Sequence, residues 1–304
     1  MKTMTERALV IETIEEYNTL SGCETRNHLV SLIESTSSRM REKTDMMKLG
    51  FYAVYLKCPV EPKVVKRELE KSKDSEETDY IVVTYAPYSE ISLKKQPYDI
   101  IALYFSPTLI KGSSFGRHYS EYTYFQYTRE ESLPLTGYER DLMLAIFSRI
   151  HEELRQKEDR NTVHLLTDLV KFVLDLCLRC YDRQFKSRHK QNYQIAEQFL
   201  QNVNLYLNNG LAKKMGPPSI SYFADLACTS PGYFSDIIKR ETGVNIKKYI
   251  QYKIVEVAKQ MLTADSRPIT EIAEWLGFKY PQHFTRLFKH ETGMSPRDYR
   301  KQRK

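Results

Sequence analysis

Polar side chains that suit contact with DNA recur along residues 282–289 at the spacing of one helix face. The amide of Gln282 matches the hydrogen-bonding edge of adenine in a major groove, and the guanidinium of Arg286 matches that of guanine. Lys289 suits a phosphate or its own helix end, whose dipole favours a cation. An ion pair between Arg286 and Asp298 is the alternative within the chain. The polar residues of this face are Gln282, His283, Thr285, Arg286 and Lys289.

The same pattern occurs 50 residues earlier, where Phe234 and Gly243 take the places of Phe284 and Gly293. A repeat of this length indicates one supersecondary design used twice. The contact positions of the first copy are Gly232, Tyr233, Ser235, Asp236 and Lys239. Asp236 replaces an arginine and can only accept hydrogen bonds, so it either contacts a donor such as cytosine N4 or stabilises its own helix. We therefore expect the two copies to contribute unequally.

Each copy has the sequence pattern of a helix-turn-helix. In the second copy, Gly277 is a typical helix end, Phe278 fills the corner, and Pro281 suits the first turn of the next helix. The core-facing residues predicted for these two helices are Ile269, Ile272, Ala273, Leu276, Phe284, Leu287 and Phe288.

The first copy is predicted at residues 219–241, with Ser230 as the N-cap and Pro231 as the first residue of its second helix. A long helix over residues 245–262 joins the two copies. Two recognition helices held by one rigid helix could enter successive major grooves on one face of DNA, roughly 10 bp apart.

The motif of the second copy resembles the signature of the AraC/XylS family of transcription regulators. It comprises Gly277, Phe278, Phe284, Arg286, Phe288, Lys289, Gly293, Met294, Ser295, Pro296, Tyr299 and Arg300. The resemblance covers the chain from near residue 192 to residue 304. It implies a double helix-turn-helix domain over 193–304, promoter DNA as the ligand, and RNA polymerase as a further expected partner.

The charge distribution supports a polyanionic partner for this part of the chain. Residues 192–304 contain 17 Lys and Arg against 10 Asp and Glu, whereas residues 1–191 contain 29 of each. The whole formal charge of +7 therefore lies in the repeated part, and binding to DNA should weaken steeply as salt rises.

Residues 1–135 have the composition of a β-rich domain. Four runs rich in β-branched and aromatic residues predict strands at 51–57, 80–87, 98–105 and 122–127, and the charged segment 66–79 is predicted to be an exposed loop. Short strands at this spacing favour a small barrel or jelly roll. The resemblance to AraC-like regulators implies a cupin-like sensing domain here.

A barrel mouth is a usual place for a small ligand, so aromatic residues of these strands are candidates for an effector pocket. They are Tyr52, Tyr55, Tyr85, Tyr104 and Tyr124, with Phe105 beside them. Their alternative role is ordinary core packing. Only His28 and His118 lie in this region, and a metal-dependent enzyme needs clustered ligands. We therefore expect no metal and no cofactor.

Residues 136–185 are predicted to be helical, and residues 186–192 to be a polar linker. A heptad-like seam suggests dimerisation through Val163, Leu166, Val170, Val173 and Cys177. Leu165, Leu169, Phe172 and Leu176 form a second stripe, so this helix should bury two faces. Cys177 and Cys180 have CxxC spacing, but without a second pair we favour packing over metal or redox chemistry.

The sequence thus predicts a homodimeric, sequence-specific DNA-binding regulator, with a helical C-terminal domain and a barrel-like N-terminal one. Control by a small-molecule effector and control by a protein partner or by abundance stay open, and a barrel enzyme fused to a DNA-binding domain is a remote alternative. Five scattered cysteines, a charged N-terminus and the lack of a long apolar run favour a reduced cytoplasmic protein without a membrane span.

Overall fold

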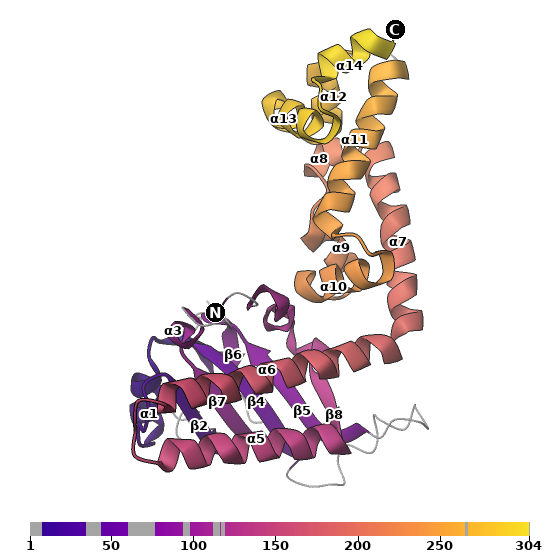
Figure 1. The fold of residues 1–304 in the computed structure, drawn as a ribbon. Helices are drawn as coiled ribbons and strands as arrows, with labels where there is room; N and C mark the ends of the chain where they lie inside the picture. Colours follow the sequence, from indigo (N-terminus) through magenta and orange to yellow (C-terminus); the bar gives the residue numbers. More distant parts are fainter. Residues whose placement is uncertain are drawn as a thin grey trace, which may run out of the picture. The chain divides into compact units, whose positions relative to one another are not determined.

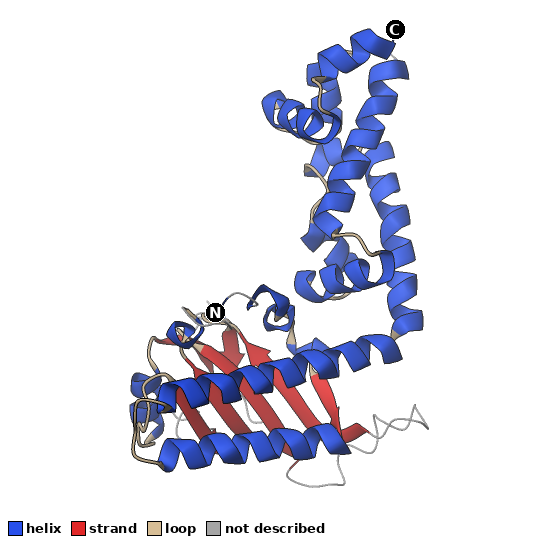
Figure 2. Ribbon diagram, viewed as in Figure 1, coloured by secondary structure: helices blue, strands red, loops and turns tan. Residues whose placement is uncertain are grey.

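The computed structural model describes residues 8–34, 44–59, 77–93, 98–111, 116, 119–264 and 267–303. The chain divides into two compact units, residues 1–186 and residues 187–304. The first unit combines strands with helices, and the second is entirely helical in its described part (Figure 2). A β-rich N-terminal part and a helical C-terminal part were both predicted, and both are confirmed.

The strands described in the first unit form two sheets. The larger has the strand order β2-β7-β4-β5-β8, and all of its neighbours are antiparallel. The smaller has the order β1-β3-β6, with a parallel β1–β3 pair. The strands are β1 (Leu9–Ile11), β2 (Val30–Glu34), β3 (Met46–Leu49), β4 (Tyr52–Pro59), β5 (Glu77–Tyr85), β6 (Glu90–Ser92), β7 (Tyr98–Phe105) and β8 (Leu133–Thr136).

Short helices and two long ones complete this unit. They are α1 (Ile14–Ser21), α3 (Pro107–Ile110), the 3-10 turns η2 (Tyr119–Glu121), η3 (Thr123–Gln126) and η4 (Arg129–Glu131), and the long helices α5 (Gly137–Arg155) and α6 (Thr162–Ser187). The segment 60–76 lies outside the described residues, and with it most of the predicted exposed loop at 66–79. Residues 77–79 belong to β5 instead.

The residues of both sheets share one apolar core. Ile11 and Met47 of the small sheet pack with Tyr55 and Tyr104 of the large one, together with Tyr17 of α1. The Tyr104 hydroxyl donates to that of Tyr17 at 2.8 Å, and it lies 3.1 Å from that of Tyr55. These bonds give the buried hydroxyl groups hydrogen-bond partners, without which their burial would destabilise the fold.

The described strands make two sheets stacked over that core, and they show no closed barrel. The cupin-like character of this unit stays a prediction. The opposite face of the large sheet is covered by α5 and α6, as Figure 2 shows. Alternation along β4 explains the two faces, since Ala53 and Tyr55 face the small sheet while Val54 and Leu56 are fully buried on the other side. Two apolar faces on one strand require cover on both sides.

The strand predicted at 122–127 is wrong, because residues 123–126 form η3. Long-range contacts override the β propensity of this aromatic run. Tyr124 donates to the carbonyl oxygen of Leu174 in α6 at 2.9 Å, and its ring stacks on Tyr181 at 5.3 Å.

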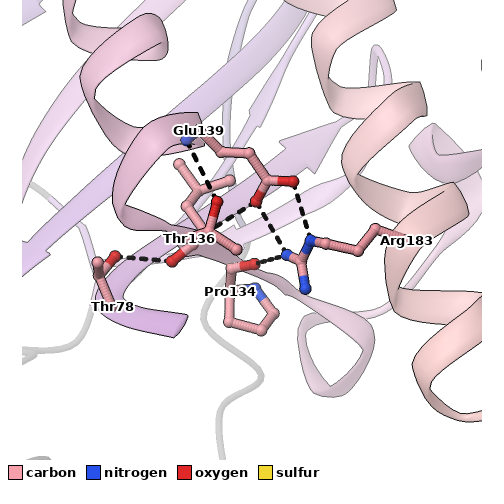
Figure 3. A network of polar contacts seen from close by, with 6 residues as sticks. Thr78, Pro134, Thr136, Glu139 and Arg183 are labelled. Carbon is pink, nitrogen blue, oxygen red and sulfur yellow. Dashed lines mark hydrogen bonds and ion pairs between the residues drawn. The ribbon is translucent and has the colours of Figure 1, made fainter. Parts of the chain in front are cut away.

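A polar network fastens α6 to α5 and to the strand β8 (Figure 3). The Arg183 guanidinium donates to both carboxylate oxygens of Glu139, at 2.9 and 3.0 Å, and to the Pro134 carbonyl at 2.7 Å. Glu139 also accepts from the Thr136 N–H and so completes a capping box at the start of α5. Burial alone would raise the pKa of Glu139, but these donors hold the pKa below its ordinary value.

The predicted dimerisation seam on α6 lies inside the unit instead. Leu166, Val170, Val173 and Cys177 have no exposed surface, so a second chain cannot reach them, and only Val163 is exposed. Burial raises the pKa of the Cys177 thiol to about 12, which agrees with a packing role. The second stripe is the one that faces solvent in part, at Leu165, Leu169 and Phe172, whereas Leu176 is buried.

Eight helices make up the described part of the second unit. They are α7 (His189–Asn208), α8 (Leu211–Met215), α9 (Ile220–Leu226), α10 (Pro231–Thr242), α11 (Ile246–Ala264), α12 (Ile269–Trp275), α13 (Pro281–Thr292) and α14 (Pro296–Arg303). The linker predicted at 186–192 is helical except at Arg188, because α6 extends to Ser187 and α7 begins at His189. None of the described helices combines the length and apolar character that crossing a bilayer requires.

Candidate DNA-binding interface

Two helix-turn-helix units, α9–α10 and α12–α13, confirm the predicted repeat. The long helix α11 contacts both, and Figure 1 shows α10 and α13 on the same side of α11, one toward each of its ends. Its 19 residues span about 28 Å, somewhat less than the roughly 34 Å of one turn of B-DNA. One side of this helix is buried, at Ile246, Ile250, Ile254, Val257, Met261 and Leu262.

The turn of the second unit depends on Gly277, which has a φ of +88°. A side chain there would also have no room, because a Cβ atom would lie 2.4 Å from Gly216 and 2.6 Å from Ala212. The N–H of Phe278 donates to Ala273 at 2.9 Å, and the Phe278 ring packs on Phe284 at 5.7 Å. The predicted corner is therefore confirmed, and its glycine is obligatory.

The residues that the two copies share at their ends are structural. Gly243 and Gly293 both have positive φ, and their N–H groups donate to the backbone carbonyl oxygens of Lys239 and Lys289 at 2.9 Å. This is the usual left-handed termination of a helix. Lys239 and Lys289 are exposed in the last turns, where a cation complements the helix dipole.

The predicted contact face of α13 is turned to solvent. Gln282, His283, Arg286 and Lys289 are exposed, whereas Phe284 and Phe288 on the opposite side are fully buried. Among the described residues Arg286 has no hydrogen-bond or ion-pair partner. Asp298, its alternative partner, accepts instead from the Ser295 hydroxyl at 2.5 Å.

Two hydroxyls of the candidate face are already used as donors. Thr285 donates to the Pro281 carbonyl at 3.1 Å, and Ser235 of the first copy donates to Pro231 at 2.6 Å. Thr285, which is half-buried, therefore offers a methyl group and an acceptor oxygen to a base edge, and its methyl would suit thymine.

The first copy presents less of its predicted face. Gly232 and Tyr233 are buried, Ser235 and Asp236 are half-buried, and Lys239 is exposed. The assignment of Gly232 and Tyr233 as base-contacting residues is thus not supported, because matching the spacing of Gln282 and His283 does not ensure matching exposure. The unequal contribution of the two copies stays a prediction.

Sequence reasoning did not include Lys279 and Tyr280 in the candidate interface. Both are exposed and immediately precede α13, and the Lys279 ammonium lies 5.6 Å from the centre of the Tyr280 ring. The signal in the sequence is the tyrosine itself, since it occupies the position where the first copy has Ser230.

The tyrosines predicted to line an effector pocket do not converge on one cavity. Tyr52 and Tyr55 are three residues apart and therefore lie on opposite faces of the large sheet. Tyr52 stacks on Phe105 at 5.0 Å, whereas Tyr55 joins Tyr104 in the inter-sheet core, where burial raises the pKa of both phenols. The other two candidates, Tyr85 and Tyr124, are also buried, one on each side of the sheet.

A cavity of about 280 Å³ lies elsewhere in the first unit, along β2 and the end of α5. Arg26 and His151 are among its lining residues, and none of the five tyrosines is. In the described part of the chain, no three His, Cys, Asp or Glu side chains are grouped to hold a metal ion.

Comparison with known proteins gives matches for the C-terminal part. Residues 223–302 match the protein family described as a helix-turn-helix domain. The uncharacterized HTH-type transcriptional regulator YobQ of Bacillus subtilis is 35% identical over 95 residues, which are 31% of this chain and 38% of that protein. The arabinose operon regulatory protein of Escherichia coli is 28% identical over 81 residues, which are 27% of this chain and 28% of that protein.

A solved structure, the C-terminal domain of the response regulator AraT from Geobacillus stearothermophilus, is 28% identical with a TM-score of 0.32. That match covers 36% of this chain and 85% of the other. The matched part of this chain thus spans well under half of the curated relatives named above.

The second unit is a DNA-binding domain of the tandem helix-turn-helix class. This domain is similar to the helix-turn-helix domains of AraC-type regulators such as the arabinose operon regulatory protein.

Proposed function

We propose that this chain is a transcriptional regulator that binds promoter DNA through α10 and α13 in successive major grooves. The observation that carries the proposal is the exposed polar face of α13, presented by a unit that holds the chain's surplus positive charge. On this face Arg286 has no partner among the described residues. The spacing set by α11 supports simultaneous entry into two grooves. Its relatives YobQ and the arabinose operon protein are named as regulators of transcription or of an operon.

The test is fluorescence anisotropy of the full chain on the DNA upstream of its own gene and on a scrambled duplex, each titrated with salt. A preference for the native duplex, with steep salt dependence on both, is the expected result. Absence of binding to either duplex at low salt would overturn the proposal.

Arg286→Ala should weaken binding to the specific duplex by about 1–3 kcal/mol and relax the preference at one base pair. The reason is that its guanidinium has no partner among the described residues and is free to pair with a guanine. Binding of a set of single-base operator variants measures the effect.

Lys289→Ala is the matched control, since it removes one positive charge from the same helix near its end. It should weaken binding to all duplexes alike and lower the slope of affinity against salt by about 1. Equal behaviour of the two variants across the operator set would remove Arg286 from base readout.

We further propose that the chain is a homodimer through the partly exposed apolar row of α6, residues Leu165, Leu169 and Phe172. Phe172 is 51% exposed and Leu165 is 45% exposed, although both are large and apolar. The three residues are spaced at i, i+4 and i+7 and so lie on one side of the helix. This row takes the role first predicted for the buried seam beside it.

Phe172→Glu should convert the dimer to a monomer, because a carboxylate would be buried without a partner in the interface. Sedimentation velocity of the full chain measures the mass. Tyr138→Glu is the control, since Tyr138 is an exposed aromatic residue on α5 and 69% exposed. It should leave the dimer intact, and a monomeric wild-type chain would contradict the interface.

For control by an effector, the 280 Å³ cavity beside β2 is the binding place that we propose. Control by a protein partner or by abundance needs no cavity. Thermal shift against pools of metabolites separates the two, because a ligand selective for the folded state raises the melting temperature. RNA polymerase is the partner expected at a promoter in either case.

A further inference from the structure

The two recognition helices begin differently. In the first copy Ser230 is the N-cap of α10, and its side chain accepts from the N–H of Tyr233 at 3.1 Å. Tyr280 holds the same position before α13 and makes no side-chain cap. Serine is among the most favourable N-cap residues, and an aromatic residue cannot replace its hydrogen bond. The second copy therefore forgoes a stabilising contact that the first copy makes.

Packing of the Tyr280 ring does not compensate for the lost cap. The side chain is 49% exposed, and its ring neighbours are Lys279, at 5.6 Å from the ring centre, and His283, whose ring lies 5.6 Å away edge-on. Both of these residues are themselves exposed. The Tyr280 hydroxyl has no hydrogen-bond partner in the described part of the chain. The exposed Tyr280, with a hydroxyl group that is free to donate, thus lies next to the ammonium group of Lys279.

The backbone conformation places the Tyr280 side chain at the start of α13. Tyr280 is extended, with φ −123° and ψ 115°, as is usual for a residue before a proline. Pro281 starts the helix, and Gln282 and Arg286 follow on the candidate contact face. In helix-turn-helix proteins the N-terminal end of the recognition helix enters the major groove. A residue just before that end lies at the groove's rim, where phosphates line the DNA.

We propose that Tyr280 and Lys279 form a phosphate-contacting pair, an inference that rests on the proposed DNA binding by α13. The tyrosine hydroxyl donates a hydrogen bond to a backbone phosphate at the rim of the groove, and the lysine ammonium neutralises the same phosphate. Tyrosine hydroxyls and lysines are common donors to phosphate oxygens. The pair sets the register of α13 in the groove and carries no base specificity of its own.

Because a phosphate contact does not depend on sequence, the test needs no operator. The affinity of the full chain for a short fluorescent duplex of mixed sequence is measured at several salt concentrations. Tyr280→Phe should weaken binding by roughly three- to tenfold and leave the salt slope unchanged, since it removes a donor but no charge. Lys279→Ala should weaken binding and lower the slope by about 1.

Tyr252→Phe is the matched control. Tyr252 is 58% exposed and also lies beside a lysine, with the Lys253 ammonium 6.0 Å from its ring, but it belongs to α11. This variant should bind like the wild type. Tyr280→Ser should raise the melting temperature by restoring a cap and still weaken binding, which separates DNA contact from folding.

Wild-type affinity in Tyr280→Phe, or unweakened binding by a stabilised Tyr280→Ser, would overturn the pair while leaving DNA binding itself intact. Equal losses in Tyr280→Phe and Tyr252→Phe would overturn it too. A wild-type chain that binds no duplex would instead defeat the proposed function.

Discussion

Gly277→Ala should destabilise the second unit by about 4 kcal/mol or more, which is at the upper end of single-residue effects. Two costs add at this position. The backbone has a φ of +88°, which costs an alanine about 1–2 kcal/mol. The new methyl group would also overlap backbone atoms of Gly216, Ala212 and Pro217 at 2.4–2.6 Å, and backbone cannot rotate away as a side chain can.

The chain provides its own optical probe for this measurement. Its one tryptophan, Trp275, lies in α12, so tryptophan fluorescence during denaturant unfolding reports on the second unit. Gly293→Ala is the matched control, because Gly293 has a φ of +78° but open space around its Cβ position. It should cost only about 1–2 kcal/mol. Equal losses for the two glycines would show that the close approach of residues 212–217 does not matter.

Arg183→Ala should destabilise the first unit by about 3–5 kcal/mol, because it leaves the carboxylate of Glu139 buried without its cation. That carboxylate side chain is only 11% exposed. Glu139→Gln in the same chain is the control, since the amide oxygen can still accept from the Thr136 N–H. The double variant, Arg183→Ala with Glu139→Gln, should lose less stability than Arg183→Ala alone. Additive losses of stability in circular-dichroism melts would contradict the network.

The same network predicts a pH dependence. The pKa of Glu139 is lower in the folded chain than in the unfolded one, so its contribution is complete above the unfolded value of about 4.3 and is lost as pH falls through the folded value. The stability difference between the wild type and Arg183→Ala should therefore narrow below about pH 4. A constant difference across that range would mean that the carboxylate charge is not involved.

The second helix-turn-helix was predictable in detail because its determinants are local. Gly277, Pro281 and Gly293 each act on the backbone within one turn, and the apolar spacing around them identifies the buried face. The exposure of Arg286 follows from that same spacing. A short-range pattern is enough wherever one helix face is apolar and the other is not.

The first unit depended on contacts that no short pattern contains. The aromatic run around Tyr124 has strand propensity, yet it forms η3. The reason is a distant contact, since the Tyr124 hydroxyl donates to the carbonyl oxygen of Leu174, fifty residues away. On α6 both stripes look apolar, and periodicity cannot tell which one the sheet will cover. The buried positions Leu166 and Val170 were therefore predicted as the interface, whereas Leu165 and Phe172 of the other stripe are exposed.

The tandem arrangement along α11 has a consequence for the DNA sequence itself. One chain carries two candidate recognition helices in tandem, and their candidate contact residues differ, with Gln282 and Arg286 in one and Ser235 and Asp236 in the other. On the proposed mode of binding, each chain recognises a site that has a direction and no internal palindrome. Reversing such a site would turn the bound protein around on the promoter, so the orientation of a site, as well as its position, becomes regulatory information.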